Sequence, residues 1–284
     1  MLIFVEKVNE RLTYTFDFIF KERDLSYVFT SSESEFEKSL GPKFNYSKKN
    51  IANTASITPS KMLFDDGVEN YTLNRSLFNE EECLSINGVS DPVASIFYIL
   101  TRYEEYDSSF KDKHGRHIGK KSVLYRFGWH EKAMCDRWSE NILWFLSAHT
   151  SFTFEKKKYR PQIIPTFDID KAYAYKHKGI IRNVLGYFKD LYAKDTIRTK
   201  ERSMVLSGSK KDPFDNYDKI FEIQSRGFDV KLFWMLGNYG KYDKNISHKN
   251  RRHRRLIRKM DTIASIGIHP SYRSNSNEFN IHNE

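Results

Sequence analysis

The chain has 284 residues, of which 39% are hydrophobic and 30% charged, a composition typical of a folded globular protein and not of a disordered or fibrous one. Its length favours two domains over one. The two cysteines, Cys83 and Cys135, lie far apart and form no CxxC spacing, which argues against a disulfide framework or a thiolate zinc site. The opening residues do not have the pattern of a signal peptide, and no stretch approaches the roughly 18 apolar residues of a membrane span. We therefore expect a cytoplasmic protein with no membrane span.

Much of the formal net charge of +10 lies in residues 249–259, KNRRHRRLIRK. Leu256, Ile257, Met260 and Ile263 recur at helical spacing here, which predicts an amphipathic helix with a solvated basic face. A nucleic-acid interface would use the same charge, but no recognised nucleic-acid motif accompanies it. We favour the solvated helix and expect no nucleic-acid partner.

The first half of the chain alternates strand-like and helix-like stretches. Residues 2–8 predict a strand and 12–22 a helix. Residues 91–106 open with Asp-Pro, a favourable helix start, and predict a buried helix with an acidic, aromatic end. After a polar loop, residues 134–148 predict another helix. The sequence turns charged and extended near 154–160, so we place the domain boundary there, between an N-terminal α/β domain (1–155) and a second domain (160–284).

From residue 162 the pattern becomes repetitive. Pro165 cannot donate to a strand ladder, so we expect the first strand of this part to begin at Thr166. After a long insertion the predicted order is helix, strand, helix, strand, at residues 217–227, 229–237, 251–265 and 266–269. Such alternation is typical of parallel βαβ units. Three strands cannot close a barrel, so we expect an open half-sheet or a partial barrel.

Acidic and histidine residues stand at the ends of two of these strands. Asp168 and Asp170 flank Ile169, and because strand side chains alternate, both carboxylates face one side. His269 ends the last predicted strand and would emerge at the same edge. Together they are candidates to bind a divalent metal, with one acid as base toward a bound water. The alternatives are solvated acids that cap the next loop and a histidine packed for structural reasons.

Two further histidines, His114 and His117, are spaced for chelation in the segment KDKHGRH. Asp112 is the one acidic residue in that segment and no cysteine accompanies it. We therefore favour a surface loop over a metal site here.

The motifs TFDID (166–170) and IHPSY (268–272) resemble those of the polysaccharide deacetylase superfamily, like carbohydrate esterase family four. Its domain is a distorted (β/α) barrel with an early Asp-containing strand and a later histidine motif. The phrases KKDPFDNYD and LGNYGKYDKNISHKN resemble a Bacteroidetes-type branch, and DPVASIFYILTRYEEY is similar to that branch's N-terminal domain of unassigned function. The implied architecture is an N-terminal α/β domain followed by a partial, distorted (β/α) barrel.

The resemblance also implies roles for residues. In that superfamily one Asp is the catalytic base, and another binds a metal, usually Zn²⁺, with the two histidines of a His-x-x-x-His motif. Asp168 is then the base, and Asp170 and His269 are metal ligands. Arg273 stands where the second histidine is expected, and an arginine stays protonated and cannot be a ligand. Either another group completes the site, or metal binding is weakened or lost.

The implied function is a metal-dependent hydrolase that removes N-acetyl groups from amino sugars of a cell-envelope polysaccharide or its precursor. The alternative is a non-catalytic glycan-binding or scaffold protein on a degenerate deacetylase fold. The family's later strands carry an arginine motif and a general-acid histidine, and this sequence ends before both. We therefore expect no turnover from residues 1–284 alone, and self-association through an open sheet edge.

Overall fold

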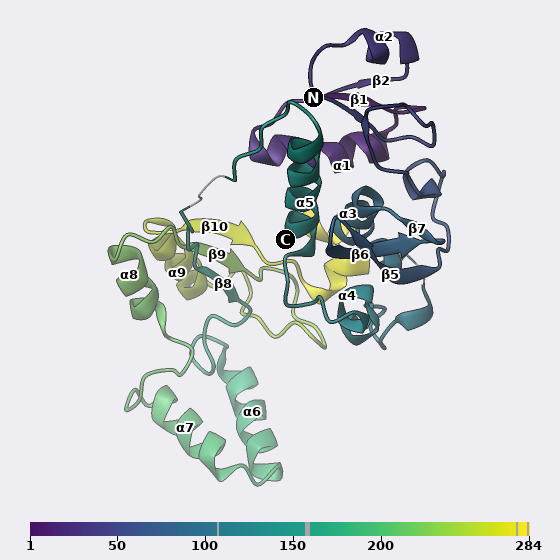
Figure 1. Cartoon of the computed structure of the whole chain (residues 1–284). Helices are drawn as coiled ribbons and strands as arrows, with labels where there is room; N and C mark the ends of the chain where they lie inside the picture. The colour runs from purple at the N-terminus through teal and green to yellow at the C-terminus, as the bar shows by residue number, and fades with distance from the viewer. Residues whose placement is uncertain (107, 157–159, 277, 283) are drawn as a thin grey trace. The chain divides into compact units, whose positions relative to one another are not determined.

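The computed structural model describes residues 1–106, 108–156, 160–276, 278–282 and 284. The chain divides into two compact units, Met1–Tyr159 and Arg160–Glu284, whose elements are labelled in Figure 1. Both units combine helices with parallel strands, so the protein belongs to the α/β class. The distorted (β/α) barrel stays a prediction.

The first unit contains two sheets. One is parallel, has the strand order β2-β1-β3-β4, and is built from β1 (Leu2–Phe4), β2 (Val28–Thr30), β3 (Lys43–Asn45) and β4 (Ala55–Ser56). The other is an antiparallel meander of β5 (Leu73–Phe78), β6 (Glu81–Ile86) and β7 (Val89–Ser90). The predicted first strand is thus confirmed but shorter than residues 2–8.

The helices of the first unit are α1 (Glu10–Phe20), α2 (Glu33–Lys38), α3 (Pro92–Leu100), α4 (Val123–Arg126) and α5 (Met134–His149). Asp91 begins α3 as its N-cap, where its side chain accepts a hydrogen bond from the Ala94 N–H at 3.0 Å. The expected continuation of this helix through residue 106 is wrong. The backbone turns left-handed at Arg102 (φ 52°), which interrupts the helical hydrogen bonding, and Tyr103–Glu105 form a separate 3₁₀ turn, η3.

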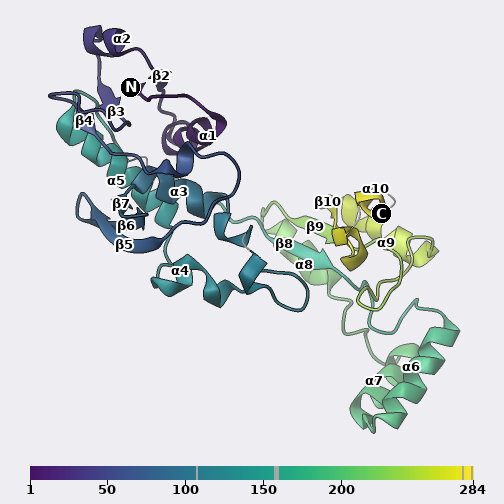
Figure 2. The same ribbon diagram turned by 90° about the vertical axis from the view of Figure 1, so that its right-hand side faces the viewer.

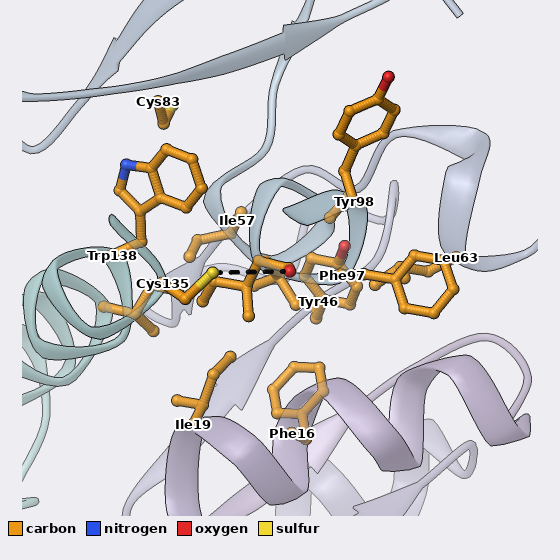
Figure 3. Close-up of a cluster of buried hydrophobic side chains, with 14 of the residues drawn as sticks. Phe16, Ile19, Tyr46, Ile57, Leu63, Cys83, Phe97, Tyr98, Cys135 and Trp138 are labelled. Atoms are coloured by element: carbon orange, nitrogen blue, oxygen red, sulfur yellow. Dashed lines mark hydrogen bonds between the residues drawn. The ribbon is translucent and has the colours of Figure 1, made fainter. Parts of the chain in front are cut away.

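The core of the first unit lies between α1, α3 and α5. Figure 3 shows Phe16 and Ile19 of α1 on the side of Phe97 of α3 and Cys135 of α5, while Trp138 of α5 points toward Cys83 of β6. The apolar residues at helical spacing in α1 are fully buried, as their periodicity predicts: Leu12, Phe16, Ile19 and Phe20. None of the three predicted site residues, Asp168, Asp170 and His269, belongs to this cluster.

The second unit is built on a parallel sheet of strand order β10-β9-β8, formed by β8 (Thr166–Ile169), β9 (Lys231–Trp234) and β10 (Ser265–Ile268). All three predicted strands are confirmed, and β8 begins at Thr166 directly after Pro165. Among the described residues, β8 and β10 each pair on one side only. The sheet is therefore open at both edges in this part of the chain.

The helices of the second unit are α6 (Ile180–Tyr192), α7 (Thr196–Leu206), α8 (Tyr217–Ser225), α9 (Arg251–Asp261) and α10 (Glu278–His282). The predicted basic amphipathic helix is confirmed as α9: Leu256 and Met260 pack into the core, whereas Arg254 and Arg255 are exposed. The long insertion after β8, for which we had predicted no element, contains α6 and α7.

Candidate functional site

The register of the sheet brings the predicted site residues to one edge. Ile169, Trp234 and Ile268 lie in one row across β8, β9 and β10, so the three strands end together. His269, the residue directly after β10, donates its backbone N–H to the Trp234 carbonyl at 2.9 Å, which extends the pairing of β10 with β9 by one residue. His269 and Asp170 are thus equivalent positions on the two outer strands, at the carboxyl edge where α/β enzymes place their chemistry.

The side chains of the three predicted residues meet across β9. Nε2 of His269 lies 3.7 Å from Asp170 Oδ1 and 3.9 Å from Asp168 Oδ2. The exposed fractions of the side chains are 31% for the histidine and 62% and 60% for Asp168 and Asp170. The alternation of β8 accounts for the pair of acids, because both are exposed while Ile169 between them packs against the core. The result is a solvated cluster of two acids and one imidazole.

The second ring nitrogen of His269 fixes how the imidazole faces the acids. Nδ1 lies 3.0 Å from the carbonyl oxygen of Pro270, and because a carbonyl only accepts hydrogen bonds, Nδ1 carries the proton. In the neutral ring, Nε2 then presents a lone pair to two carboxylates. A metal cation bound at Nε2 would therefore also lie close to both carboxylates.

A metal would need closer spacing than these side chains have. Zinc bonds of about 2.0–2.2 Å place tetrahedral ligand atoms about 3.3–3.4 Å apart, somewhat less than the separations from Nε2. Accordingly, the described part of the chain contains no group of three or more His, Cys, Asp and Glu side chains positioned to hold a metal ion. The donor types and the free Nε2 position suit zinc, and an approach of about half an ångström by exposed side chains would bring the donors into range.

The acids also border a place for a substrate. Asp168 and Asp170 line a groove of about 720 Å³ that runs along β8 and α8. The exposed Phe214 and Lys219 also line this groove, and Tyr217 borders it from the buried core. Aromatic faces beside carboxylates are a common setting for sugar rings, which offer both apolar C–H faces and hydroxyl groups.

The polar residues after His269 have other partners. Ser271 and Ser274 are buried, their Oγ atoms lie 3.0 Å apart, and both donate to the carboxylate of Glu284. The backbone N–H of Tyr272 donates to Asp243 at 3.0 Å. Within the described residues these bonds form a polar network beside the histidine. Arg273, at the position of the family's second histidine, is exposed in the short 3₁₀ helix η6 (Tyr272–Ser276).

Asp212, which the sequence analysis does not single out, holds the loop that follows β8. Its buried carboxylate accepts backbone N–H bonds from Ala174, Tyr175 and Lys176 at 2.7, 2.9 and 3.0 Å, and from Phe214 at 3.0 Å. Burial by itself would raise the pKa of Asp212, but these bonds outweigh it and hold the pKa below its ordinary value. The carboxylate therefore clamps the loop that follows Asp170. The Asp-Pro dipeptide at this position is a turn signal that could have indicated it.

The other histidine pair is arranged as a loop. Oδ1 of Asp112 accepts the backbone N–H groups of His114 and Arg116 at 2.8 and 3.0 Å, an Asx-type turn. Lys111 and His117 pair as an isolated antiparallel bridge. Both ring nitrogens of His117 are buried without a hydrogen-bond partner in the described residues. The segment is a closed turn, and among the described residues no group of three or more His, Cys, Asp and Glu side chains is placed to hold a metal ion there.

Fold and site define a two-unit α/β protein whose second unit carries an acid–histidine cluster at the carboxyl edge of a parallel sheet. The sequence model of a family of unknown function, DUF7033, matches residues 1–151, more than half of the chain, and the protein belongs to that family. No curated protein matches the chain, and no solved structure does. A search of the described helices finds none with the length and apolar character needed to cross a membrane.

Proposed function

We propose that this protein is a metal-dependent hydrolase of the polysaccharide deacetylase type, which removes N-acetyl groups from amino sugars of a cell-envelope polysaccharide or its precursor. The observation that carries the proposal is the meeting of Asp168, Asp170 and His269 at one sheet edge, with Nε2 of the histidine turned toward both acids. These residues come from motifs about 100 positions apart in the sequence. The motif resemblance supplies the reaction, and the geometry supports it.

Each residue has a distinct part in this proposal. Asp170 and His269 would hold the metal, and Asp168 would accept the proton of the attacking water at its carboxylate. A bound zinc ion would supply the Lewis acidity that lowers the pKa of water and polarises the acetyl carbonyl. The groove beside β8 would orient the sugar, with its acetamido group toward the acids and its ring against Phe214, whose side chain is exposed. Protonation of the leaving amine requires a further acid, which we do not assign to a described residue.

A second function is favoured by a specific observation. Arg273 replaces the expected second histidine, and the described residues lack a closed ligand set. A protein that binds glycans on the same scaffold without catalysis would need the groove and the aromatic wall but no metal. This alternative predicts glycan binding that chelators do not affect.

Zinc binding separates the two functions. Isothermal titration of the metal-free chain with Zn²⁺ should show one site, and Asp170→Asn or His269→Gln should each weaken it by about tenfold or more, since each removes a proposed ligand. His130→Gln, a surface change in the other unit, is the matched control and should leave the affinity unchanged. Acetate release from N-acetylglucosamine oligomers is then measured on the native protein with zinc.

Absence of zinc binding, or binding that both ligand variants retain, would refute the hydrolase. Retention on chitin beads that persists in EDTA, together with no zinc site, would establish the glycan-binding alternative.

A further inference from the structure

The helical pair α6–α7 of the second unit presents an apolar surface to solvent. Along α6 the apolar side chains occupy an arc of roughly 160° on a helical wheel, and they are exposed: Ile180, Ile181, Val184, Leu185, Tyr187, Phe188, Leu191 and Tyr192. The exposed fractions are 78% for Ile181, 65% for Leu185 and 63% for Phe188. Among the residues of α6, only Asp190 is buried. Single exposed apolar residues are ordinary, but a continuous face of this size marks an interaction site.

The contact between the two helices is polar, which explains why the apolar arc faces outward. Arg202 of α7 donates to Asp190 Oδ2 of α6 from Nη2 at 2.7 Å and from Nε at 3.1 Å, and both side chains are more than nine-tenths buried. Nη1 of the same arginine lies 3.3 Å from Asn183 Oδ1. Gly186 gives the guanidinium its space, because a Cβ there would lie 2.6 Å from Nη1. The helices α6 and α7 lie side by side in both views (Figure 2).

A self-contained helical hairpin buries the apolar faces of its two helices against each other. In α6–α7 the arrangement is reversed, because an ion pair lies between the helices and apolar side chains face outward. The pair is also tied to the rest of its unit. Arg182 donates to the carbonyls of Asn245 and Lys244 at 3.0 and 2.6 Å, and Asn250 donates to the His177 carbonyl at 2.9 Å. The exposed arc of α6 thus belongs to an anchored element.

The charge around this face indicates its partner. Residues 176–211 contain ten Lys and Arg side chains and three Asp and Glu side chains, a local net charge of +7 (10 − 3). Lys189, Lys194 and Lys200 are exposed on and just beyond the two helices. An amphipathic helix with an aliphatic and aromatic face and a basic surround has the properties of a helix that lies in the interface of an anionic bilayer.

We propose that α6, supported by α7, is a membrane-docking surface that inserts its apolar arc among the headgroups of anionic phospholipids. Lipid acyl chains would cover the apolar side chains, and phosphate groups would neutralise the surrounding lysines and arginines. This inference stands on the hairpin alone and does not depend on the proposed hydrolase. It implies a peripheral protein, held at the bilayer surface by reversible contacts.

Flotation with vesicles tests the proposal on the whole chain. The protein should float with vesicles of phosphatidylglycerol and phosphatidylcholine and not with phosphatidylcholine alone. Leu185→Ser/Leu191→Ser should weaken binding by about tenfold or more, because two leucines lose their burial in lipid. The matched control is Leu40→Ser/Leu77→Ser, two exposed leucines of the other unit, which should bind as the unmodified protein does.

A second pair of variants keeps the test decisive if the serine variant loses helicity by circular dichroism. Lys189→Glu/Lys194→Glu leaves the apolar arc intact and should also weaken binding to anionic vesicles. Arg254→Glu/Arg255→Glu, the same change of charge on α9, should weaken that binding less. No flotation with anionic vesicles, or loss of binding through α9 alone, would overturn the proposal. So would a dimer by light scattering that the leucine variant disrupts, since a second copy would then cover the arc.

Discussion

Replacing Asp212 by asparagine is a sharp test of the clamp beside the candidate site. Oδ1 accepts from the backbone N–H groups of Ala174 and Phe214, and Oδ2 from those of Tyr175 and Lys176. An asparagine of the same shape offers one oxygen and one NH₂ group. Whichever way it is turned, two backbone donors lose their acceptor and face another donor.

The expected loss follows from these bonds. Hydrogen bonds to a charged group contribute about 1.5–3 kcal/mol each, so losing two lowers the unfolding free energy of this unit by roughly 3–6 kcal/mol. Asp212→Ala loses all four bonds and should be at least as severe. Asp218→Asn is the matched control. The Asp218 carboxylate is exposed, and among the described side chains it accepts a hydrogen bond from the Lys211 ammonium. Its replacement should leave the unfolding free energy unchanged within error.

The dependence of the unfolding free energy on pH provides a second test of the hydrogen bonds to Asp212. The folded pKa of Asp212 lies below its ordinary value of 3.8, so the ionised carboxylate stabilises the fold fully above that pH. This contribution is lost as the pH falls below 3.8 toward the folded pKa. The asparagine variant has no such carboxylate and should lack that part of the acid sensitivity.

Hydrogen exchange followed by mass spectrometry measures the effect locally, which matters because two units need not unfold as one. Peptides that cover residues 174–176 should exchange much faster in Asp212→Asn than in the unmodified protein or in Asp218→Asn. Equal protection in all three proteins, or urea unfolding of the variant within about 1 kcal/mol of the unmodified chain, would refute the clamp.

Three further outcomes can be measured. Gly186→Ala should destabilise α6 and speed its hydrogen exchange because its Cβ displaces the Arg202 guanidinium, and the same change should become stabilising in an Arg202→Ala background, where only the gain in helix propensity of about 1 kcal/mol remains. Burial raises the pKa of the Cys83 thiol to about 11 and that of the Cys135 thiol to about 12, so both should react with Ellman's reagent only after unfolding, and rapid labelling of the native protein would contradict their burial. Asp91→Ala should lower the unfolding free energy of the first unit by about 2–4 kcal/mol, seen in thermal denaturation, because it removes the cap of α3 and leaves buried donors unpaired.

The local signals in the sequence determined the elements that surround the site. Short apolar runs, proline and periodicity located β8, β9, β10 and α9, because a strand or amphipathic helix shows its buried face in its own residues. The juxtaposition of Asp168, Asp170 and His269 also followed from sequence, since parallel strands joined by helices end at the same edge. Strand direction, together with the alternation of side chains along each strand, is enough to predict this meeting.

Tertiary structure decided the features that depend on partners distant in the chain. The clamp of Asp212 on residues 174–176 and the buried pair of Arg202 and Asp190 join segments that no periodicity links. The break at Arg102 depends on a left-handed backbone that its own residue type does not favour. In α6 the arc of apolar residues is visible in the sequence, but whether such an arc faces a core or solvent depends on what packs against it. There a buried ion pair occupies the contact with α7, and the apolar side chains face outward.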